Sequence, residues 1–256
     1  KNKKIIALII AKKNSKGLKN KHLLNLSGKK IIEWSFSEAN QSKYVDEVML
    51  STDSDKIIKI AKKYKIKVPF KRPLRLSKDI SKITDVVNHT KKFLKKNNND
   101  NFDLLILLQG SSPFRTGKHI DGAIDHFIKN YKKASTLVSG YKIQKKFSWI
   151  LKKKKNYVNF SSTIGTKQYR RQANNDLYLP NGAIFISKFK DKLSTYYKKQ
   201  TIFYEMKARE SIDIDTVEDY LEAKKYVWTL NTFLFFKPTW NIFPIFKNWI
   251  NKCFLF

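Results

Sequence analysis

One stretch near the start of the chain constrains the fold more than any other, residues 5–23, IIALIIAKKNSKGLKNKHL. Its seven leading apolar residues, 5–11, predict a strand buried on both faces, as in a parallel sheet. Lysines in the loop that follows would neutralise phosphate charge, and Gly17 and Asn14 can adopt backbone geometries that point N–H groups at oxygen atoms. The stretch therefore favours a phosphate site at the carboxyl edge of a sheet, with a merely solvated lysine-rich loop as the alternative.

The charge of the chain is extreme. Its 256 residues include 53 Lys and Arg against 21 Asp and Glu, a net charge of +32. Such a balance raises the possibility of nucleic-acid binding. The lysines are spread along the whole sequence rather than clustered, which disfavours a dedicated nucleic-acid surface and leaves this function as an alternative. The charge will still attract acidic small molecules and anionic surfaces.

Cysteine and hydropathy patterns point to a cytoplasmic enzyme. Cys253 is the single cysteine, so an internal disulfide and a cysteine-based metal site are excluded. The apolar run 5–11 is too short for a signal peptide, and no stretch reaches the length of a membrane span. At this length, with 41% hydrophobic residues, the chain can build one large α/β domain, with or without appendages.

Strand and helix patterns alternate along most of the chain. Apolar runs predict strands at 5–11, 47–50, 68–70, 103–109, 135–138, 183–186 and 201–206. Periodic patterns predict helices at 30–41, 55–65, 84–96, 118–131 and 216–227, with Thr84 capping the third of them. This alternation predicts a parallel sheet covered on both faces, with ligands bound where the strands end.

Two segments depart from this alternation. Residues 140–178 combine alternating polar and aromatic residues with a lysine run, which predicts an extended, β-rich insertion. The tail, 228–256, is rich in Trp and Phe, and Pro238 and Pro244 interrupt any helix there. Its aromatic residues suit packing against the body or a partner subunit, and the alternative is contact with a membrane surface.

The sequence holds one pair of carboxylates with the spacing of a metal site. If the segment around Asp213 and Asp215 is extended, both side chains face one point while Ile212 and Ile214 face the core. Paired carboxylates suit Mg²⁺, which binds one or two of them together with substrate phosphates. The alternative is a helix cap formed by Asp215 with Glu218. Neither a Walker pattern nor a dinucleotide fingerprint is present.

Other polar side chains are candidates for ligand contacts. Four of them follow the strand 103–109 directly: Gln109, Ser111, Ser112 and Arg115. Their position at a strand end favours a ligand role, and turn formation is the alternative. Arg170 and Arg171 in the insertion would grip a carboxylate or phosphate in a bidentate manner, unless they are simply solvated. Asp85 and His89 have the spacing of a surface pair on a helix.

Eight segments, taken in order, resemble the motifs of the N-acylneuraminate cytidylyltransferases, the CMP-sialic acid synthetase family. They are 11–22 (AKKNSKGLKNKH), 51–54 (STDS), 71–76 (KRPLRL), 85–89 (DVVNH), 108–116 (LQGSSPFRT), 170–172 (RRQ), 181–185 (NGAIF) and 213–220 (DIDTVEDY). Each is weak alone, but eight in one order are specific. The likeness covers residues 3–227, nearly the whole chain except the tail.

The resemblance implies a fold and a reaction. The expected fold is a Rossmann-like nucleotidyltransferase domain, 1–227, with a mainly parallel sheet, an insertion at 140–180 that crosses to the partner of a homodimer, and the tail 228–256. The expected enzyme is a cytidylyltransferase that activates a nine-carbon 2-keto acid sugar of the N-acetylneuraminate type with CTP, giving CMP-sugar and pyrophosphate for cell-surface polysaccharide biosynthesis. The alternatives are the same reaction on legionaminic or pseudaminic acid, or a non-catalytic nucleotide-sugar binder.

The resemblance also implies roles for single residues. Nucleotide binding falls to Lys12, Asn14, Ser15, Lys16, Lys21, Arg72 and Ser77. Sugar binding falls to Gln109, Ser111, Ser112, Arg170, Arg171 and Asn181, with one of the two arginines reaching the sugar carboxylate from the partner chain. Lys21, Asp213 and Asp215 are the expected catalytic residues, and the two aspartates are the expected Mg²⁺ ligands.

The opening loop departs from the family pattern. Lys12 stands where the family has Arg, which keeps the charge and loses the planar fork. Lys13 and Asn14 replace two glycines, and His22 replaces an Asn. Asn tolerates a left-handed backbone moderately well and Lys poorly, so the backbone of this loop decides how well the replacements are accommodated.

Overall fold

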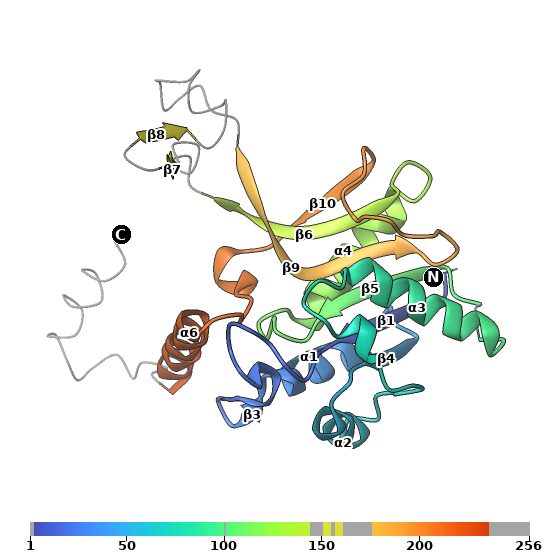
Figure 1. Cartoon of the computed structure of the whole chain (residues 1–256), viewed down its shortest axis with the longest axis horizontal. Helices are drawn as coiled ribbons and strands as arrows, with labels where there is room; N and C mark the ends of the chain where they lie inside the picture. The colour runs from blue at the N-terminus through green and yellow to red at the C-terminus, as the bar shows by residue number, and fades with distance from the viewer. Residues whose placement is uncertain (1–2, 100, 144–150, 155–156, 161–175, 236–256) are drawn as a thin grey trace, which may run out of the picture.

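The computed structural model describes residues 3–99, 101–143, 151–154, 157–160 and 176–235. Its centre is a six-stranded sheet in the order β10-β6-β9-β5-β1-β4 (Figure 1). Strand β1 pairs in parallel with β4 and β5, and β6 pairs in parallel with β10, while β9 runs antiparallel between β5 and β6. The predicted α/β fold with a mainly parallel sheet is confirmed. The strand bounds are β1 Ile5–Ile10, β4 Glu47–Ser51, β5 Leu104–Gln109, β6 Thr136–Ile143, β9 Leu177–Lys188 and β10 Thr201–Glu205.

Helices and two small hairpins surround the sheet. The helices are α1 Ile31–Asn40, α2 Asp55–Lys63, α3 Ile83–Lys96, α4 Gly117–Lys129 and α6 Val217–Phe235. The hairpins join β2 Asn25–Leu26 to β3 Lys29–Lys30, and β7 Leu151–Lys154 to β8 Tyr157–Phe160. Short 3₁₀ helices cover Lys21–Leu23, Leu74–Leu76 and Ala208–Ser211.

The core lies on both faces of the sheet because β1 is apolar at every position. Ile5, Ala7 and Ile9 face a cluster that includes side chains of α1, α2 and α4. Ile6 and Leu8 face the opposite cluster, which includes side chains of α3. All five side chains are fully buried, and full burial of a large aliphatic side chain contributes about 1.5–3 kcal/mol. The two-sided burial explains the uninterrupted apolar run.

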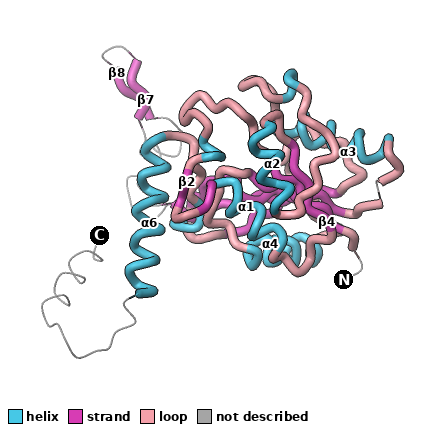
Figure 2. Tube along the Cα trace, turned by 90° about the horizontal axis from the view of Figure 1, so that it is seen from below, coloured by secondary structure: helices cyan, strands magenta, loops and turns pink. Residues whose placement is uncertain are grey.

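The carboxyl edge of the sheet gathers loops that are far apart in the sequence. The strands β1, β4 and β5 end there, and β9 starts its pairing with β5 there because it runs in the opposite direction. A third apolar cluster, which includes Leu26, Ile31 and Ile214, joins β2, α1 and α6 at this edge. Figure 2 shows α6 standing beside β2, to one side of the sheet. This cluster brings the segment before α6 against the loops that leave the first strands.

Most predicted elements are present with small shifts at their ends, but the strand predicted at 68–70 is wrong. Only an isolated bridge between Lys67 and Met49 forms there. The backbone N–H of Lys67 donates to the Val48 carbonyl at 3.2 Å, and its carbonyl accepts from Leu50 at 2.8 Å. Pro69 has no N–H to continue the ladder, so the pairing stops.

The helix cap predicted at Thr84 is wrong, and the cap considered at Asp215 as the alternative to a metal site forms at a neighbouring residue. Helix α3 begins at Ile83 after Lys82, so Thr84 lies inside the first turn as a buried residue. At α6, Asp219 Oδ2 accepts from the N–H of Thr216 at 2.8 Å, and Thr216 Oγ1 accepts from the N–H of Asp219 at 3.2 Å. The cap is therefore one residue later than the predicted pair of Asp215 with Glu218.

The insertion and the tail are described in part. Strands β6 and β9 pair over their outer halves, from Gly140 with Pro180 to Ile143 with Leu177, so the extended character predicted for this region is confirmed where it is described. Helix α6 continues to Phe235, beyond the predicted end at 227. The rest of the tail, 236–256, lies outside the described residues. In the part of the chain that the structure describes, none of the helices combines the length and apolar character that a membrane span requires.

Candidate active site

The loop after β1 carries its lysines beside an acidic residue from another loop. Lys12 Nζ lies 2.5 Å from Asp79 Oδ1, and Lys16 Nζ lies 3.4 Å from Asp79 Oδ2. Asn14 is exposed, whereas the Ser15 hydroxyl is buried and has no hydrogen-bond partner among the described residues. These ion pairs and this burial partly fix the conformation of the lysine-rich loop. The alternative of a merely solvated loop does not predict them.

The replacements at Lys13 and Asn14 fit the backbone of this loop. Asn20 is the residue of this loop with a positive φ, at 55°, whereas Lys13 and Asn14 take ordinary negative values. The side chains that replace the two family glycines therefore cause no backbone strain. Gly17 has a different requirement, because a Cβ atom there would collide with the carbonyl oxygen of Asp215. The loop after β1 thus packs directly against the segment before α6.

Lys21 and Asp215 form the central ion pair of the site. Lys21 begins a 3₁₀ helix and is 7% exposed, and its Nζ donates to Asp215 Oδ1. The Asp215 side chain itself is 64% exposed, so its remaining surface faces solvent. A buried cation beside a partly exposed carboxylate is a suitable arrangement for a site that receives an anionic ligand together with a cation.

Asp213 is more buried than Asp215. Its Oδ1 atom is buried and has no hydrogen-bond partner in the described part of the chain. Burial raises the pKa of the Asp213 carboxyl, although a hydrogen bond from Ser111 acts in the opposite direction. The Ser111 carbonyl also accepts from the Ile214 N–H at 3.0 Å, which fixes this segment to the loop after β5.

The two aspartates have the character of a cation site. A buried carboxylate oxygen without a partner is costly, and a bound divalent cation would satisfy it. Within the described residues, no group of three or more His, Cys, Asp or Glu side chains is placed to hold a metal ion. A cation at Asp213 and Asp215 would therefore take its other ligands from water or from a bound phosphate, as Mg²⁺ does.

Gln109, at the end of β5, meets the start of β9 at a glycine. Gly182 has a φ of +70°, and a Cβ atom there would lie 2.7 Å from Gln109 Nε2 and 3.4 Å from Asp213 Oδ2. A side chain at this position would therefore fill the space between Gln109 and Asp213. The predicted sugar-binding residue Gln109 and the predicted metal ligand Asp213 lie on opposite sides of the same small gap.

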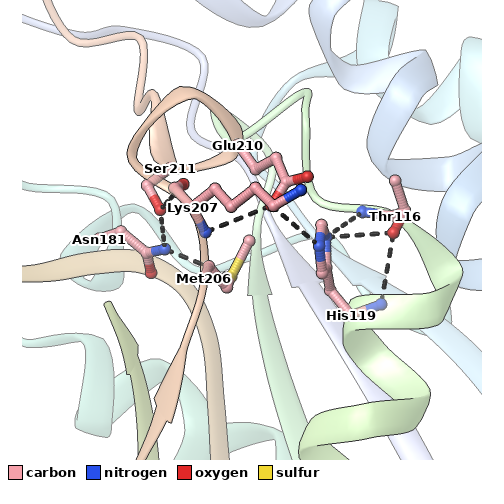
Figure 3. A network of polar contacts seen from close by, with 7 residues as sticks. All are labelled: Thr116, His119, Asn181, Met206, Lys207, Glu210 and Ser211. Carbon is pink, nitrogen blue, oxygen red and sulfur yellow. Dashed lines mark hydrogen bonds and ion pairs between the residues drawn. The ribbon is translucent and has the colours of Figure 1, made fainter. Parts of the chain in front are cut away.

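Asn181 is buried in a closed hydrogen-bond network. Its Oδ1 accepts from the Ser139 hydroxyl at 2.6 Å and from the Ala183 N–H at 3.1 Å, and its Nδ2 donates to the Ser211 hydroxyl at 2.9 Å. Figure 3 shows the Asn181 amide beside Ser211 and Met206. Both ends of the amide thus have protein partners, which ties β9 to the segment that carries Asp213.

A second connection holds the same segment from the side of α4. The His119 Nε2 atom lies 3.3 Å from Glu210 Oε2, and its Nδ1 lies 3.1 Å from the Thr116 N–H (Figure 3). Burial lowers the pKa of His119, and Glu210 opposes this shift. Sequence patterns alone missed this contact, because His119 and Glu210 lie outside the motifs and the whole predicted insertion separates them in the sequence.

Two arginines of the predicted motifs are buried within the protein. Arg72 is 5% exposed and donates through Nε to the Ser51 hydroxyl at 3.0 Å and through Nη2 to the Ser51 carbonyl. Arg115 is fully buried and donates to the carbonyls of Gln109 at 3.0 Å and Ala183 at 3.1 Å. Burial lowers the pKa of each to about 10. The Nη1 atom of Arg115 thereby joins β5 to β9, whereas its Nε and Nη2 atoms have no hydrogen-bond partner among the described residues, so the ligand role expected for Arg115 stays a prediction.

The remaining predicted residues fall into two groups. The hydroxyls of Ser77 and Ser112 are buried and have no hydrogen-bond partner among the described residues, so they are available to a ligand or water. Arg170 and Arg171 lie outside the described residues.

A pocket of about 830 Å³ opens at the carboxyl edge, within the size range of small-molecule sites. Its lining includes the predicted residues Gln109, Asn181 and Asp213. It also includes residues that the sequence patterns did not single out: Lys82, Tyr141, Tyr196, Tyr197 and Arg209. Because these residues come from four separate segments, local sequence patterns gave no sign of their convergence.

Known structures share this architecture. A CMP:2-keto-3-deoxy-manno-octonic acid synthetase complexed with CTP superposes with a TM-score of 0.65 at 16% identity, covering 89% of this chain and 99% of that chain. The 4-diphosphocytidyl-2C-methyl-D-erythritol synthase of Anaerococcus prevotii gives a TM-score of 0.58 at 17% identity, covering 88% and 96%. At these identities the likeness establishes the fold.

Sequence comparisons identify the family. The N-acylneuraminate cytidylyltransferase of Streptococcus agalactiae serotype V is 32% identical over 224 residues, 86% of this chain and 52% of that protein, so the chain spans about half the length of this relative. The CMP-N,N'-diacetyllegionaminic acid synthase of Legionella pneumophila is 31% identical over 230 residues, 87% of this chain and 95% of that protein. The pseudaminic acid cytidylyltransferase of Campylobacter jejuni serotype O:2 is 29% identical over 238 residues, 89% and 97%. The family model described as cytidylyltransferase matches residues 6–237, and the chain belongs to this family.

Proposed function

We propose that this chain activates a nine-carbon 2-keto acid sugar with CTP, producing a CMP-sugar and pyrophosphate. The observation that carries the proposal is the ion pair of buried Lys21 with exposed Asp215, close in sequence to Asp213, whose unpaired oxygen belongs to a residue that lines the pocket. Relatives named for N-acylneuraminate, pseudaminic acid and legionaminic acid support this class of acceptor. All three acids remain candidate acceptors.

The loop after β1 would hold the triphosphate. Lys12 and Lys16 project from this loop, and Lys21 lies at its far end against Asp215. Three cations around one loop neutralise much of the charge that CTP brings to the site. Asn14 and the Ser15 hydroxyl would add neutral contacts, and the Ser15 hydroxyl has no other described partner. The nucleotide would then extend past Ser77 and the buried Arg72.

The reaction would be an in-line displacement at phosphorus. The anomeric hydroxyl oxygen of the sugar forms a bond to the α-phosphorus, the bond from that phosphorus to the bridging oxygen of the β-phosphate breaks, and pyrophosphate leaves with its electron pair. The hydroxyl proton passes to solvent. Such a step needs positioning and charge neutralisation more than a nucleophilic side chain, which agrees with the composition of the site.

Asp213 and Asp215 would hold Mg²⁺ in this reaction. When bound, the ion would polarise the α-phosphate and lower the pKa of the attacking hydroxyl. The unpaired buried oxygen of Asp213 and the exposed carboxylate of Asp215 fit such an ion. Lys21 would remain beside them and favour the developing negative charge on the phosphates.

The pocket beyond Gln109 would hold the sugar. Its volume of about 830 Å³ suits a sugar of this size, and its tyrosines and hydroxyl groups suit a polyol. Gln109 and the loop of Ser111 and Ser112 would contact the acceptor near the reacting hydroxyl, and Asn181 would support that wall. The acceptor carboxylate would meet Arg170 or Arg171 of a partner chain.

A homodimer accompanies this proposal. Strand β9 and the β7–β8 hairpin carry exposed apolar side chains at Tyr157, Val158, Tyr178 and Leu179. Exposed apolar side chains of this kind favour a protein interface. A second copy would cover them and bring its own arginines to the sugar. Because CTP is a cytoplasmic metabolite, the reaction would take place in the cytoplasm.

Pyrophosphate release tests the proposal directly. The protein would be incubated with CTP and Mg²⁺, in separate reactions with N-acetylneuraminate, legionaminate, pseudaminate or no sugar, and UTP would replace CTP in a matched set. Release that requires both CTP and one acid sugar would support the proposed reaction and name the acceptor. CTP binding without release in any mixture would instead support a non-catalytic nucleotide-sugar binder and overturn the proposal.

A further inference from the structure

Two lysines of the loop after β1, Lys12 and Lys16, share one carboxylate. Asp79 approaches Lys12 through Oδ1 at 2.5 Å and Lys16 through Oδ2 at 3.4 Å. The three side chains are 29%, 85% and 40% exposed for Lys12, Lys16 and Asp79 respectively. A carboxylate that uses one oxygen for each lysine occupies the same position relative to the two cations as a phosphate group would.

Asp79 belongs to a turn that is closed by its own hydrogen bonds. The turn follows the 3₁₀ helix Leu74–Leu76, and its Ser81 donates from the backbone N–H to the Lys78 carbonyl at 3.1 Å and from its hydroxyl to the Arg75 carbonyl at 2.8 Å. Neither bond involves the phosphate loop. The neighbouring Ile80 is 88% exposed, so little apolar packing holds the turn in place. The Asp79 side chain can therefore leave the lysines without breaking another element of the fold.

We propose that Asp79 is an internal anion that occupies the polyphosphate position on Lys12 and Lys16 until a polyphosphate displaces it. This inference rests on the proposed function, because it assigns the two lysines to the triphosphate of CTP. Asp79 then becomes a specificity-determining residue for the nucleotide: a ligand must bring enough negative charge to this position to replace a carboxylate that is already there.

The proposal explains how the loop distinguishes ligands and releases product. A triphosphate carries several negative charges and replaces the single charge of Asp79. CMP, whose one phosphate stays near Lys21 and the two aspartates, gains nothing from these two lysines. Once the bond to the α-phosphorus is broken, pyrophosphate is no longer held by the nucleoside. Asp79 competes with it for the lysines and favours its departure.

The charge state of Asp79 agrees with this role. The hydrogen bond from Lys12 holds the pKa of the Asp79 carboxyl below its usual value, with a smaller contribution from Lys16. The carboxylate is therefore present as a competing anion throughout the neutral range, and the competition depends on ligand charge rather than on pH.

Equilibrium binding to three variants tests the proposal. Titration calorimetry would measure the affinity for inorganic tripolyphosphate, CTP and CMP at fixed ionic strength. Asp79→Asn removes the competing charge with little change in shape. Asp79→Glu keeps a carboxylate. Asp55→Asn makes the same change in net charge at another exposed pair, in which Asp55 at the start of α2 lies 2.7 Å from Lys71, and it serves as the matched control.

The expected result is tighter ligand binding when the negative charge of Asp79 is removed. Asp79→Asn should bind tripolyphosphate and CTP about three- to tenfold more tightly, because exposed ion pairs of this kind lower affinity by that order when a ligand must break them. Its affinity for CMP should be unchanged, and Asp79→Glu and Asp55→Asn should match the wild type for all three ligands.

Three other results would overturn the inference in distinguishable ways. If the wild type binds CTP and Asp79→Asn binds it equally or more weakly, Asp79 is not a competing anion, while the proposed function stands. If Asp55→Asn tightens binding as much as Asp79→Asn does, overall charge and not the local exchange is responsible. If neither tripolyphosphate nor CTP binds the wild type, the proposed function fails together with the inference.

Discussion

The two sides of the candidate site are held together by different interactions. On the lysine side, which consists of Lys12, Lys16 and their partner Asp79, exposed ion pairs join two surface loops. On the amide side, which consists of Asn181 with Ser139 and Ser211, buried hydrogen bonds join β6, β9 and the segment before α6. Lys16 has a side chain that is 85% exposed, whereas Asn181 is 5% exposed.

This difference has an energetic consequence. An exposed ion pair contributes about 0.2–1 kcal/mol and is readily exchanged for another partner. A buried polar group that loses its partner costs about 1–3 kcal/mol. The lysine side is therefore suited to a ligand that arrives and leaves with its charge, and the amide side is suited to keep the acceptor pocket and the two aspartates in fixed positions.

The largest expected effect lies where the two sides meet. Asp215→Asn should lower kcat by about 10²- to 10³-fold, the size expected when a group that supports charge at the reacting centre is lost. Glu218→Gln, a nearby exposed change on α6, should leave kcat unchanged. Initial rates of pyrophosphate release with CTP and the identified sugar would measure both. Activity of Asp215→Asn within twofold of wild type would remove Asp215 from the site.

The amide side should respond in stability. Asn181→Ala removes the acceptor of the Ser139 hydroxyl and the donor to the Ser211 hydroxyl, and should lower the free energy of unfolding by about 2–3 kcal/mol. The matched control is Asn40→Ala, which removes one exposed bond of 2.9 Å to the Tyr64 carbonyl and should cost less than about 1 kcal/mol. Urea unfolding would measure both. Equal losses in the two variants would contradict the contrast between the sides.

His22 tests the comparison from a third position, because it is buried although it follows the same loop as Lys12 and Lys16. Burial and the neighbouring Lys21 lower the pKa of His22 to about 3. The unfolded chain then binds the proton more readily, so the stability from neutral His22 is complete above about pH 6.5 and is lost as the pH falls toward 3.

Replacing His22 with Asn, the residue usual in the family, should flatten this dependence. Between pH 6.5 and 5 the wild type should lose about 2 kcal/mol of unfolding free energy more than His22→Asn does. Urea unfolding at the two pH values would measure the difference, with His126→Asn as a control that keeps His22. Parallel losses in wild type and His22→Asn would mean that His22 carries no proton-linked stability.

The smallest expected effect belongs to a single exposed lysine. Lys16→Met should weaken CTP binding by about fivefold, because it removes one charged phosphate contact, and should leave the melting temperature unchanged. Lys19→Met, an exposed change in the same loop, should alter neither property. Calorimetric titration and thermal unfolding would check the pair. A large fall in melting temperature for Lys16→Met would mean that the lysine side also stabilises the fold, as the amide side does.

Much of the fold could be predicted from sequence because its strongest signal is local. Uninterrupted apolar runs at β1 and β5 can be explained by burial on both faces, and both strands have a neighbouring strand on each side in the sheet. The strand expected at 68–70 failed because Pro69 ends the ladder after one bridge. Local patterns thus located the strands, but they did not reveal which short apolar segments would find a partner.

The candidate site was less predictable. The spacing of Asp213 and Asp215 predicted that they act together. Only the fold shows that Asp213 is buried beside Ser111 and that Asp215 forms an ion pair with Lys21. Arg115 lies in a motif with ligand-binding potential, yet its side chain points into the protein. Asp79 had no signal in a lysine-rich turn. Side-chain direction and long-range partners are set by tertiary packing, which single-sequence patterns do not contain.

The position of β9 has a consequence for how the chain is assembled during synthesis. Strand β6 pairs with β9 and β10 but not with β5, so until β9 is made the sheet consists of a three-stranded half and an isolated strand. The contact between Lys21 and Asp215 spans 194 positions in the chain and forms later still. Contacts of such long range are slow to form, and the intermediate leaves strand edges exposed. A nascent chain would therefore have the loop after β1 early and the segment of Asp213 and Asp215 last. The candidate site would stay incomplete until almost all of the described fold had left the ribosome.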